Sequence, residues 1–352
     1  MFIVKGELFL EKLRLGKTEL MVTKTSFGAL PIQRDDFPTA IRILRKAFDA
    51  GINYFDTARY YTDSEEKLGA ALSDVRKEVI ISSKSMGKTK QEVIDHCMQG
   101  LRNIRSDYFD LYQLHNPSSL DYEDPDGPLA GLLELQKKGY VRHIGITNHS
   151  PKMAIEAIES GVFETLQFPF CYLSGEVEDD LLRRCKEKDM GFIAMKALSG
   201  GLVGNVPAAV AFIRQYDNVV PIFGIQHEWE LDEFLALDAN PPALNDELWA
   251  IIEKDRKELA GEFCRSCGYC MPCPQGINIP TAARIHLLAT RAPYQPFLTK
   301  KYREEQKLVE NCVHCGKCAS RCPYHLDTPS MLAAQNKKFW AWAEEHKDEW
   351  TD

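Results

Sequence analysis

Short β-branched runs alternate with amphipathic helical stretches eight times between Thr25 and Ala239. The eight runs are TSFGAL, NYFDTA, VIISSK, YFDLYQLH, RHIGITN, TLQFPF, GFIAMKAL and VVPIFGI. Between them lie segments such as KQEVIDHCMQGLRNI, whose apolar residues recur at three- and four-residue steps, as on one face of a helix. This repeated strand–helix unit favours a closed parallel (β/α)8 barrel over an open doubly wound sheet, which is the second possibility.

Polar residues close six of these predicted strands. In chain order they are Asp56, Lys84, His115, Asn148, Gln167 and Lys196. All but one of the intervals between them have room for a helix and two turns. Because the carboxyl ends of the strands of such a barrel meet at one mouth, where its active sites lie, we expect the six residues to form a ring there.

The segments on either side of the alternation complete the domain organisation. LEKLRLGKTELMV, residues 10–22, predicts a hairpin around Gly16 that closes the barrel floor. The Pro-rich segment DANPPALNDEL, residues 238–248, interrupts the rhythm and is typical of a linker. We therefore expect an α/β barrel over residues 1–240 and a small, mainly α-helical domain over residues 241–352.

The composition narrows the choice of partners and location. The 352 residues are 44% hydrophobic and 27% charged, and their net charge of −8 includes no basic block, which disfavours nucleic acid or an anionic membrane surface. No apolar run approaches the roughly 18 residues that span a bilayer. The amino-terminal segment carries charges where a signal peptide would be apolar. We expect a cytoplasmic protein, and no pattern indicates its oligomeric state.

Two short runs near the carboxyl end hold eight of the eleven cysteines. In CRSCGYCMPCP two residues separate successive cysteines, whereas CVHCGKCASRCP has gaps of two, two and three, and a proline follows each run. The second spacing is that of bacterial ferredoxins, in which three close cysteines bind one [4Fe–4S] cluster and the cysteine before proline binds the other. Two clusters are expected, and a four-thiolate zinc site is the competing interpretation.

The same rule divides the eight cysteines into two sets. The first set is Cys264, Cys267, Cys270 and Cys322, and the second set is Cys312, Cys315, Cys318 and Cys273. The first run is one residue shorter than the ferredoxin pattern before its last cysteine, so Cys273 is the least typical ligand. The remaining Cys97, Cys171 and Cys185 stand in apolar or helical contexts and are expected in the core rather than in disulfides.

Tyr61 follows the strand that Asp56 closes, in FDTARYYTDSEEKLG. A phenol can protonate a carbonyl oxygen, but its ordinary pKa is about 10. Lys84, held charged by Asp56, is expected to lower that pKa by about one to three units. His115 can hydrogen-bond the same substrate oxygen. These four residues are the candidate catalytic group.

The order and spacing of FDTA, SSK and LYQLH resemble the aldo-keto reductase family over about residues 14–238. The resemblance implies that Asp56, Tyr61, Lys84 and His115 interconvert a carbonyl and an alcohol with NAD(H) or NADP(H). The residues that it places at the cofactor are Thr147, Asn148, Gln167, Met195, Lys196, Gly224 and Glu230. Met195 or Lys196 replaces the family's stacking aromatic residue. Glu230 replaces a basic residue at the 2′-phosphate, so NAD is as credible as NADP.

The whole chain resembles those family members that carry a helical di-cluster ferredoxin domain. A nicotinamide delivers two electrons together, whereas a cluster takes one, so coupling them calls for a flavin or a redox partner protein. We expect an oxidoreductase for a small-molecule carbonyl or alcohol whose clusters transfer electrons. Two alternatives stay open: an electron-transfer protein with an idle barrel site, and a carbonyl reductase with purely structural clusters.

Overall fold

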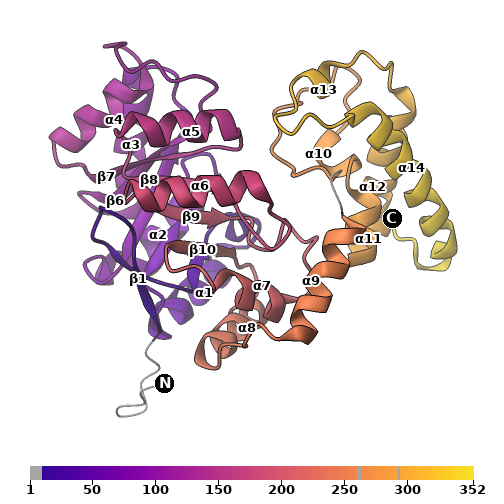
Figure 1. Ribbon diagram of the computed structural model, residues 1–352, viewed down its shortest axis with the longest axis horizontal. Coiled ribbons are helices and arrows are strands. Elements are labelled where there is room, and N and C mark those ends of the chain that lie inside the picture. Colours follow the sequence, from indigo (N-terminus) through magenta and orange to yellow (C-terminus); the bar gives the residue numbers. More distant parts are fainter. Residues whose placement is uncertain (1–9, 260–262, 292–293) are drawn as a thin grey trace. The chain divides into compact units, whose positions relative to one another are not determined.

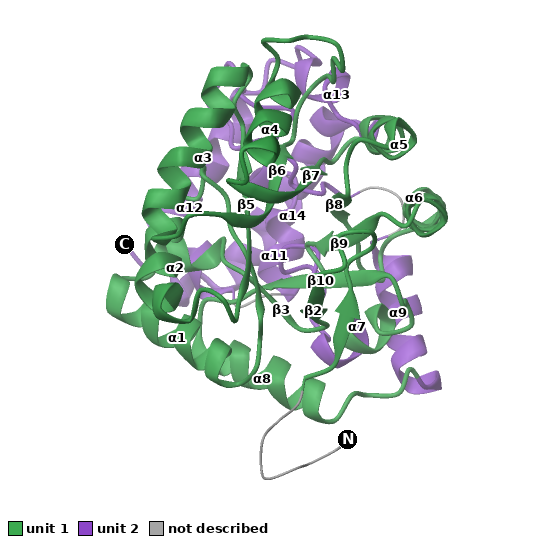
Figure 2. Ribbon diagram, turned by 90° about the vertical axis from the view of Figure 1, so that its left-hand side faces the viewer, with its two compact units in different colours: residues 1–197, 210–244 green, residues 198–209, 245–352 purple. Residues whose placement is uncertain are grey.

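The computed structural model describes residues 10–259, 263–291 and 294–352. The chain forms two compact units, which Figure 2 distinguishes by colour. The first comprises residues 1–197 and 210–244, and the second comprises residues 198–209 and 245–352. The loop that follows the seventh barrel strand is therefore part of the second unit.

The first unit contains a closed barrel of eight parallel strands, as expected from the sequence (Figure 1). Around the barrel the order is β10-β3-β4-β5-β6-β7-β8-β9. The strands are β3 Ser26–Gly28, β4 Tyr54–Asp56, β5 Ile80–Ser85, β6 Phe109–His115, β7 Val141–Thr147, β8 Thr165–Pro169, β9 Gly191–Met195 and β10 Val219–Gly224. Because the sheet closes on itself, the open doubly wound alternative is wrong.

Helices connect successive strands. They are α1 Phe37–Asp49, α2 Ser64–Leu72, α3 Lys90–Ile104, α4 Pro128–Lys137, α5 Pro151–Ser160, α6 Glu176–Glu187, α7 Val206–Ile213 and α8 Glu228–Ala239. Helix α3 shows how local sequence sets a boundary: the Thr89 side chain accepts from the Glu92 N–H at 3.2 Å, and Glu92 accepts from the Thr89 N–H at 3.3 Å. This capping box satisfies backbone donors that a helix start leaves unpaired.

A hairpin closes the amino end of the barrel, as predicted. Its strands are β1 Lys12–Arg14 and β2 Met21–Thr23, paired antiparallel. Leu15 and Val22 are buried in the core beneath the barrel strands. Gly16, at φ +52°, lies so close to β9 that a Cβ would be 2.2 Å from the Gly191 nitrogen. A side chain at Gly16 would therefore force the hairpin off the barrel floor.

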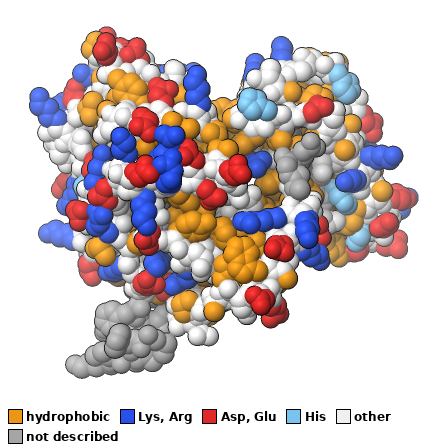
Figure 3. Space-filling view, in the orientation of Figure 1, with side chains coloured by type: hydrophobic (Ala, Val, Ile, Leu, Met, Phe, Trp, Pro, Cys, Tyr) orange, Lys and Arg blue, Asp and Glu red, His pale blue; other side chains and the backbone are white. Residues whose placement is uncertain are grey.

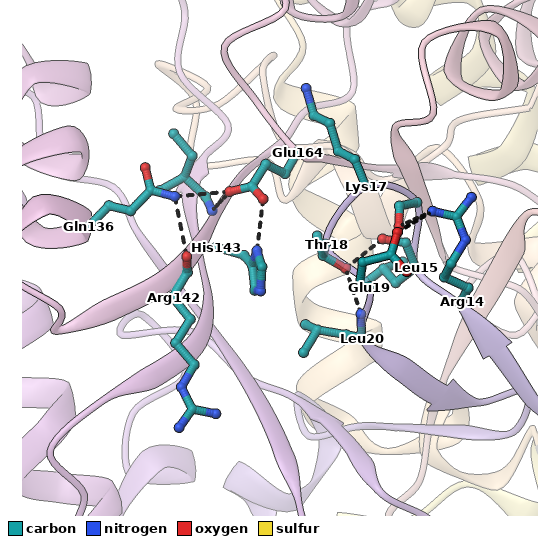
Figure 4. Close-up of polar contacts among 12 residues, drawn as sticks. Arg14, Leu15, Lys17, Thr18, Glu19, Leu20, Gln136, Arg142, His143 and Glu164 are labelled. Atoms are coloured by element: carbon teal, nitrogen blue, oxygen red, sulfur yellow. Dashed lines mark hydrogen bonds and ion pairs between the residues drawn. The ribbon is translucent and has the colours of Figure 1, made fainter.

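Half-buried polar groups reinforce the same end of the barrel (Figure 4). Oε1 of Glu164 accepts from Gln136 Nε2 at 3.0 Å and from the Ile144 N–H at 3.1 Å, and its Oε2 lies 2.7 Å from His143 Nδ1. Burial raises the pKa of Glu164, but these hydrogen bonds, led by that of His143, outweigh it and lower the pKa below 4.5.

The second unit is mainly helical. Its helices are α9 Asp246–Glu258, α10 Ile279–Ala282, α11 Ile285–Arg291, α12 Lys300–Lys307, α13 Lys317–Ser320 and α14 Thr328–Glu345. One small core packs Cys270 and Cys318 with apolar residues such as Ile279. A second packs Phe339 and Ala343 of α14 under aromatic side chains. Among the described residues, these two small clusters of side chains contribute to the core of the unit.

Charges of both signs are interspersed on the barrel face seen in Figure 3. Exposed ion pairs such as Arg14–Asp189 at 2.6 Å and Lys186–Asp217 at 2.8 Å join neighbouring elements, and pairs of this kind contribute little to stability. No helix in the described part of the chain is long and apolar enough to cross a membrane.

Candidate functional site

The six polar residues expected at the strand ends all lie at the carboxyl end of the barrel. Asp56 and His115 end β4 and β6, and Lys84 is the last residue but one of β5. Gln167 is the middle residue of β8 and pairs with Thr147, the last residue of β7, while Asn148 and Lys196 directly follow β7 and β9. The strands are parallel, so these residues surround one mouth.

Asp56 and Lys84 form a buried ion pair at this mouth. Lys84 Nζ donates to Asp56 Oδ2 and to the Thr57 carbonyl, both at 2.6 Å, and the two charged side chains are 1–2% exposed. Ser82 Oγ donates to the other Asp56 oxygen at 2.6 Å. Burial lowers the pKa of Lys84, but Asp56 and Tyr61 together outweigh it and raise the pKa. Lys84 is therefore held as an ammonium.

Tyr61 lies beside this ammonium and against His115. Its ring centroid is 5.2 Å from Lys84 Nζ, and its ring meets the His115 ring edge to face at 5.9 Å. The expected net decrease in its pKa is wrong: burial raises the pKa of Tyr61, and Lys84 offsets only part of that rise. Motif spacing cannot show how deeply the phenol is buried. The phenol consequently keeps its proton at neutral pH.

His115 is neutral. Burial, with a smaller effect of Lys84, lowers its pKa to about 3. Its Nδ1 is buried and has no hydrogen-bond partner among the described residues. A neutral imidazole can donate one hydrogen bond and accept one, so His115 can orient a substrate oxygen without adding a second positive charge next to Lys84.

Two of the residues expected at the cofactor retain groups that a ligand can contact. Thr147 Oγ1 donates to Met195 Sδ at 3.8 Å, which brings the ends of β7 and β9 together. Gln167 Oε1 accepts from Gln113 Nε2 at 2.8 Å. The Nε2 of Gln167 has no hydrogen bond to any described residue. This amide, the Thr147 hydroxyl and the Met195 thioether therefore suit a nicotinamide carboxamide and ring.

Asn148 mainly shapes the loop that carries it. Its Oδ1 accepts from the His149 and Ser150 N–H groups at 2.9 and 2.8 Å, and its Nδ2 donates to the Pro117 carbonyl at 2.9 Å. Lys196 has a left-handed backbone, at φ +56°. Such strain in a residue other than glycine concentrates at functional sites.

Gly224 and Glu230 lie at the eighth strand and the helix after it. Gly224 ends β10 and is exposed. Glu230 Oε2 accepts from the Gln226 and His227 N–H groups at 2.7 and 2.8 Å and so caps α8. Neither residue hydrogen-bonds to the four candidate catalytic residues in the described chain.

Sequence reasoning missed two residues at this mouth. Ser82 stands two positions before Lys84. Because alternate side chains of a strand point to the same face of the sheet, this spacing could have identified Ser82. His149 gave no such signal. Burial, Lys196 and His115 lower its pKa well below 6.5, which adds a second neutral imidazole to the site.

Cysteines line two cavities of the second unit. Cys264, Cys267, Cys270 and Cys322 line one cavity. Cys273, Cys312, Cys315 and Cys318 line a second, which Cys270 also borders. This grouping coincides with the two sets that the spacing predicts. No three possible ligands in the described residues gather at the distance of a single metal ion.

The two cysteine runs share a backbone pattern. Two residues after the first cysteine of each run, Ser266 and His314 have φ of 53° and 51°. Four residues after it, Gly268 and Gly316 have φ of 85° and 71°. The runs are therefore structural repeats, and their left-handed residues turn the chain back around each cavity.

The other three cysteines are core residues, as predicted. Cys97, Cys171 and Cys185 are buried, and burial raises the pKa of Cys97 and Cys185 to about 12. None of the eleven cysteines forms a disulfide in the described residues, which include all of them.

A (β/α)8 barrel with a buried Asp–Lys pair beside a tyrosine and a histidine at its mouth defines a class of barrel oxidoreductases. The model of the "Aldo/keto reductase family" matches residues 25–206, and the chain belongs to that family. A "4Fe-4S dicluster domain" matches residues 263–327. The chain is therefore an aldo/keto reductase-type oxidoreductase with an iron–sulfur domain.

Similar proteins support the barrel assignment. An uncharacterized oxidoreductase of Bacillus subtilis is 24% identical, over 56% of this chain and 68% of its own length. A methylglyoxal reductase of Escherichia coli is 29% identical, over 46% of this chain and 58% of its own length. An aldo-keto reductase of Klebsiella pneumoniae, solved in complex with NADPH, is 20% identical with a TM-score of 0.61, covering 70% of this chain and 95% of that one.

Proposed function

We propose that the chain interconverts a small-molecule carbonyl and an alcohol with NAD(H) or NADP(H). The buried Asp56–Lys84 pair at 2.6 Å beside Tyr61 is the observation that carries this proposal. The NADPH complex of the Klebsiella protein and the methylglyoxal reductase activity named for the E. coli relative support it.

In the reductive direction Tyr61 is the proton donor. Its phenol holds a proton because burial raises its pKa, and it gives that proton to the oxygen of the reacting carbonyl. Lys84 stabilises the phenolate that remains, and Asp56 keeps Lys84 charged and in place. Neutral His115 hydrogen-bonds the same oxygen and fixes the angle of the carbonyl. A bound reduced nicotinamide supplies the hydride.

Cofactor binding in this proposal uses the neighbouring strand ends. Gln167 and Thr147 hydrogen-bond the carboxamide, Met195 packs on the ring, and Asn148 and Lys196 shape the surrounding loops. Gly224 leaves room for the phosphates, and Glu230 faces the adenosine ribose. Because Glu230 places a carboxylate at the start of α8, it disfavours a 2′-phosphate and favours NAD(H).

Two [4Fe–4S] clusters fit the cysteine cavities. Cys264, Cys267, Cys270 and Cys322 hold the first, and Cys312, Cys315, Cys318 and Cys273 hold the second. On this basis the reductase domain covers residues 1–240 and the cluster domain residues 241–352, although the structure groups residues 198–209 with the second unit and residues 241–244 with the first. Of the eight ligands only Cys315 is exposed, so the second cluster is the one that exchanges electrons with a partner protein. A flavin or that partner would have to accept the electron pair of a hydride and pass the electrons on one at a time.

Replacing Tyr61 by Phe tests the catalytic proposal. The variant removes only the hydroxyl, so the proton transfer is lost and kcat falls by about 100- to 10,000-fold. Turnover of methylglyoxal is followed by nicotinamide absorbance, and cofactor binding by fluorescence. Binding that persists without turnover supports the role of Tyr61, whereas full activity refutes it.

Anaerobic absorption and spin-resonance spectra test the electron-transfer proposal. Purified protein with counted iron and sulfide receives NADH and then NADPH. Bleaching of the cluster band supports a connection between the nicotinamide site and the clusters. Clusters that stay oxidised during carbonyl turnover refute electron transfer and favour a structural role, in which cluster loss lowers stability more than the rate of the chemical step.

A further inference from the structure

Glu65, on α2, is a fully buried carboxylate with no part in the proton transfer described above. Its side chain is 0% exposed. Its Oε1 accepts from Ser83 Oγ at 2.7 Å, and its Oε2 accepts from Arg59 Nη1 at 2.5 Å and from Asn103 Nδ2 at 3.1 Å. A buried carboxylate is strongly unfavourable unless it is paired and hydrogen-bonded. The fold satisfies this one from β5, from α3 and from the loop after β4.

The neighbouring helix leaves room for this carboxylate. Gly100 of α3 lies against it, and a Cβ at that position would be 2.8 Å from Glu65 Oε1 and 3.1 Å from the Phe109 ring. Ser83 stands next to Lys84 on β5, and neighbouring side chains of a strand point to opposite faces. Ser83 therefore points out of the barrel toward α2, and the Glu65 carboxylate lies directly behind the strand that carries Lys84.

Arg59 connects this carboxylate to the loop that carries Tyr61. Its side chain, 26% exposed, pairs with Glu65, and its backbone N–H donates to the Lys84 carbonyl at 3.0 Å. The Tyr61 N–H donates to the Ala58 carbonyl at 3.0 Å, so residues 58–61 form a tight turn around Arg59. The turn is thus fastened to α2 by a side chain and to β5 by a main-chain hydrogen bond, and Tyr61 is its last residue.

We propose that the Glu65–Arg59 pair positions the phenol of Tyr61 at the mouth of the barrel. This inference rests on the proposed function, in which Tyr61 is the proton donor. A proton donor must lie within hydrogen-bond reach of the atom that it protonates, and a displacement of about 1 Å can lower a rate about 100-fold. Glu65 and Arg59 are positioning residues, which act on the substrate only through the placement of Tyr61.

Replacing Arg59 by Met or Lys tests this role. Arg59→Met breaks the link to Glu65, so kcat for methylglyoxal should fall by about 10- to 100-fold. Because proton transfer then limits turnover, the solvent deuterium isotope effect on kcat should rise. KM and nicotinamide affinity should change little, since the residues proposed at the cofactor ring lie at β7, β8 and β9. Arg59 donates to the carboxylate through one nitrogen, so the ammonium of Arg59→Lys can replace it and recover most of the rate.

Arg214 provides a matched control. Like Arg59 it is partly exposed and pairs with a buried carboxylate, that of Asp238, which also accepts from the Thr25 hydroxyl at 2.8 Å. Thr25 directly precedes β3, at the end of the barrel away from the mouth. Arg214 also pairs with Glu11. Arg214→Met should therefore lower the stability to urea at least as much as Arg59→Met and leave kcat and its isotope effect unchanged.

Steady-state rates of the full-length protein in H₂O and D₂O, with urea unfolding, measure these effects. A lower kcat with a larger isotope effect in Arg59→Met, recovered in Arg59→Lys and absent from Arg214→Met, supports the proposal. An unchanged kcat or isotope effect in Arg59→Met, or an equal fall in Arg214→Met, overturns it.

Gly100→Ala is a second, independent variant, because it displaces the Glu65 carboxylate and removes no charged or hydrogen-bonding group. If Arg59→Met does not fold, a lower kcat with a larger isotope effect in Gly100→Ala supports the proposal, and an unchanged kcat overturns it. Wild-type protein that reduces no carbonyl would refute the proposed function and this inference with it, whereas an active wild type with an unaffected Arg59→Met refutes this inference alone.

Discussion

Replacing Asp56 by Asn should damage stability and catalysis together. Lys84, 1% exposed, would keep the Thr57 carbonyl as its remaining strong acceptor. Removing one partner of a buried ion pair typically costs about 3–5 kcal/mol of unfolding free energy. The uncompensated ammonium then deprotonates more easily and no longer assists proton transfer from Tyr61. We expect kcat/KM to fall by about 100- to 10,000-fold.

A second buried pair separates these two effects. At the opposite end of the barrel, Asp110 Oδ2 accepts from Arg76 Nη2 at 2.7 Å and from the Ile81 N–H at 3.0 Å. Asp110→Asn should cost a similar unfolding free energy in urea and leave turnover of methylglyoxal unchanged. Adding Lys84→Met to Asp56→Asn should restore much of the stability and none of the activity. Equal loss of activity in the two single Asn variants would refute the reasoning.

Two further predictions concern Glu164 and Glu230. The pKa of Glu164 is lower in the folded than in the unfolded protein, so the ionised carboxylate stabilises the fold fully above its unfolded pKa of about 4.3. This stabilisation disappears as the pH falls through the folded pKa. Glu164→Gln should lower the free energy of unfolding by about 1.5–3 kcal/mol at pH 7 and by less as the pH falls below about 4. Urea unfolding that shows the same loss of free energy at each pH would contradict this. Glu230→Gln should improve the affinity for NADPH relative to NADH by about two- to fivefold. Fluorescence titration measures that ratio, and a matching shift in Glu228→Gln, whose carboxylate pairs with Arg42, would count against the role of Glu230.

The strand pattern was enough to predict the barrel. All eight strands coincide with the predicted runs except for Ser85 at the end of β5 and Val141 at the start of β7, because parallel strands buried on both faces require continuous apolar stretches, which the sequence displays directly. The hairpin at Gly16 was predictable for a related reason: a left-handed turn between short apolar runs has a distinct composition.

Properties that depend on packing between distant segments could not be predicted. The spacing of Tyr61 and Lys84 indicated that they meet, but the direction of the Tyr61 pKa shift depends on how much water the fold excludes. The sequence also gave no sign that Ser199 and Arg284, 85 positions apart, would meet. A lone arginine in IPTAARIHLLA shows its charge but not its burial.

The crossed arrangement of the cysteine cavities has a consequence for biosynthesis. In the proposed ligand sets, each run of four contributes three sulfurs to one cluster and one sulfur to the other. With the proposed ligands, a nascent chain that has emerged only as far as residue 311 therefore has a complete ligand set for neither cluster, although the barrel strands are already synthesised. If these ligand sets hold, both clusters can be completed only after Cys322 has emerged, so cofactor loading would be a late step that depends on the carboxyl-terminal repeat.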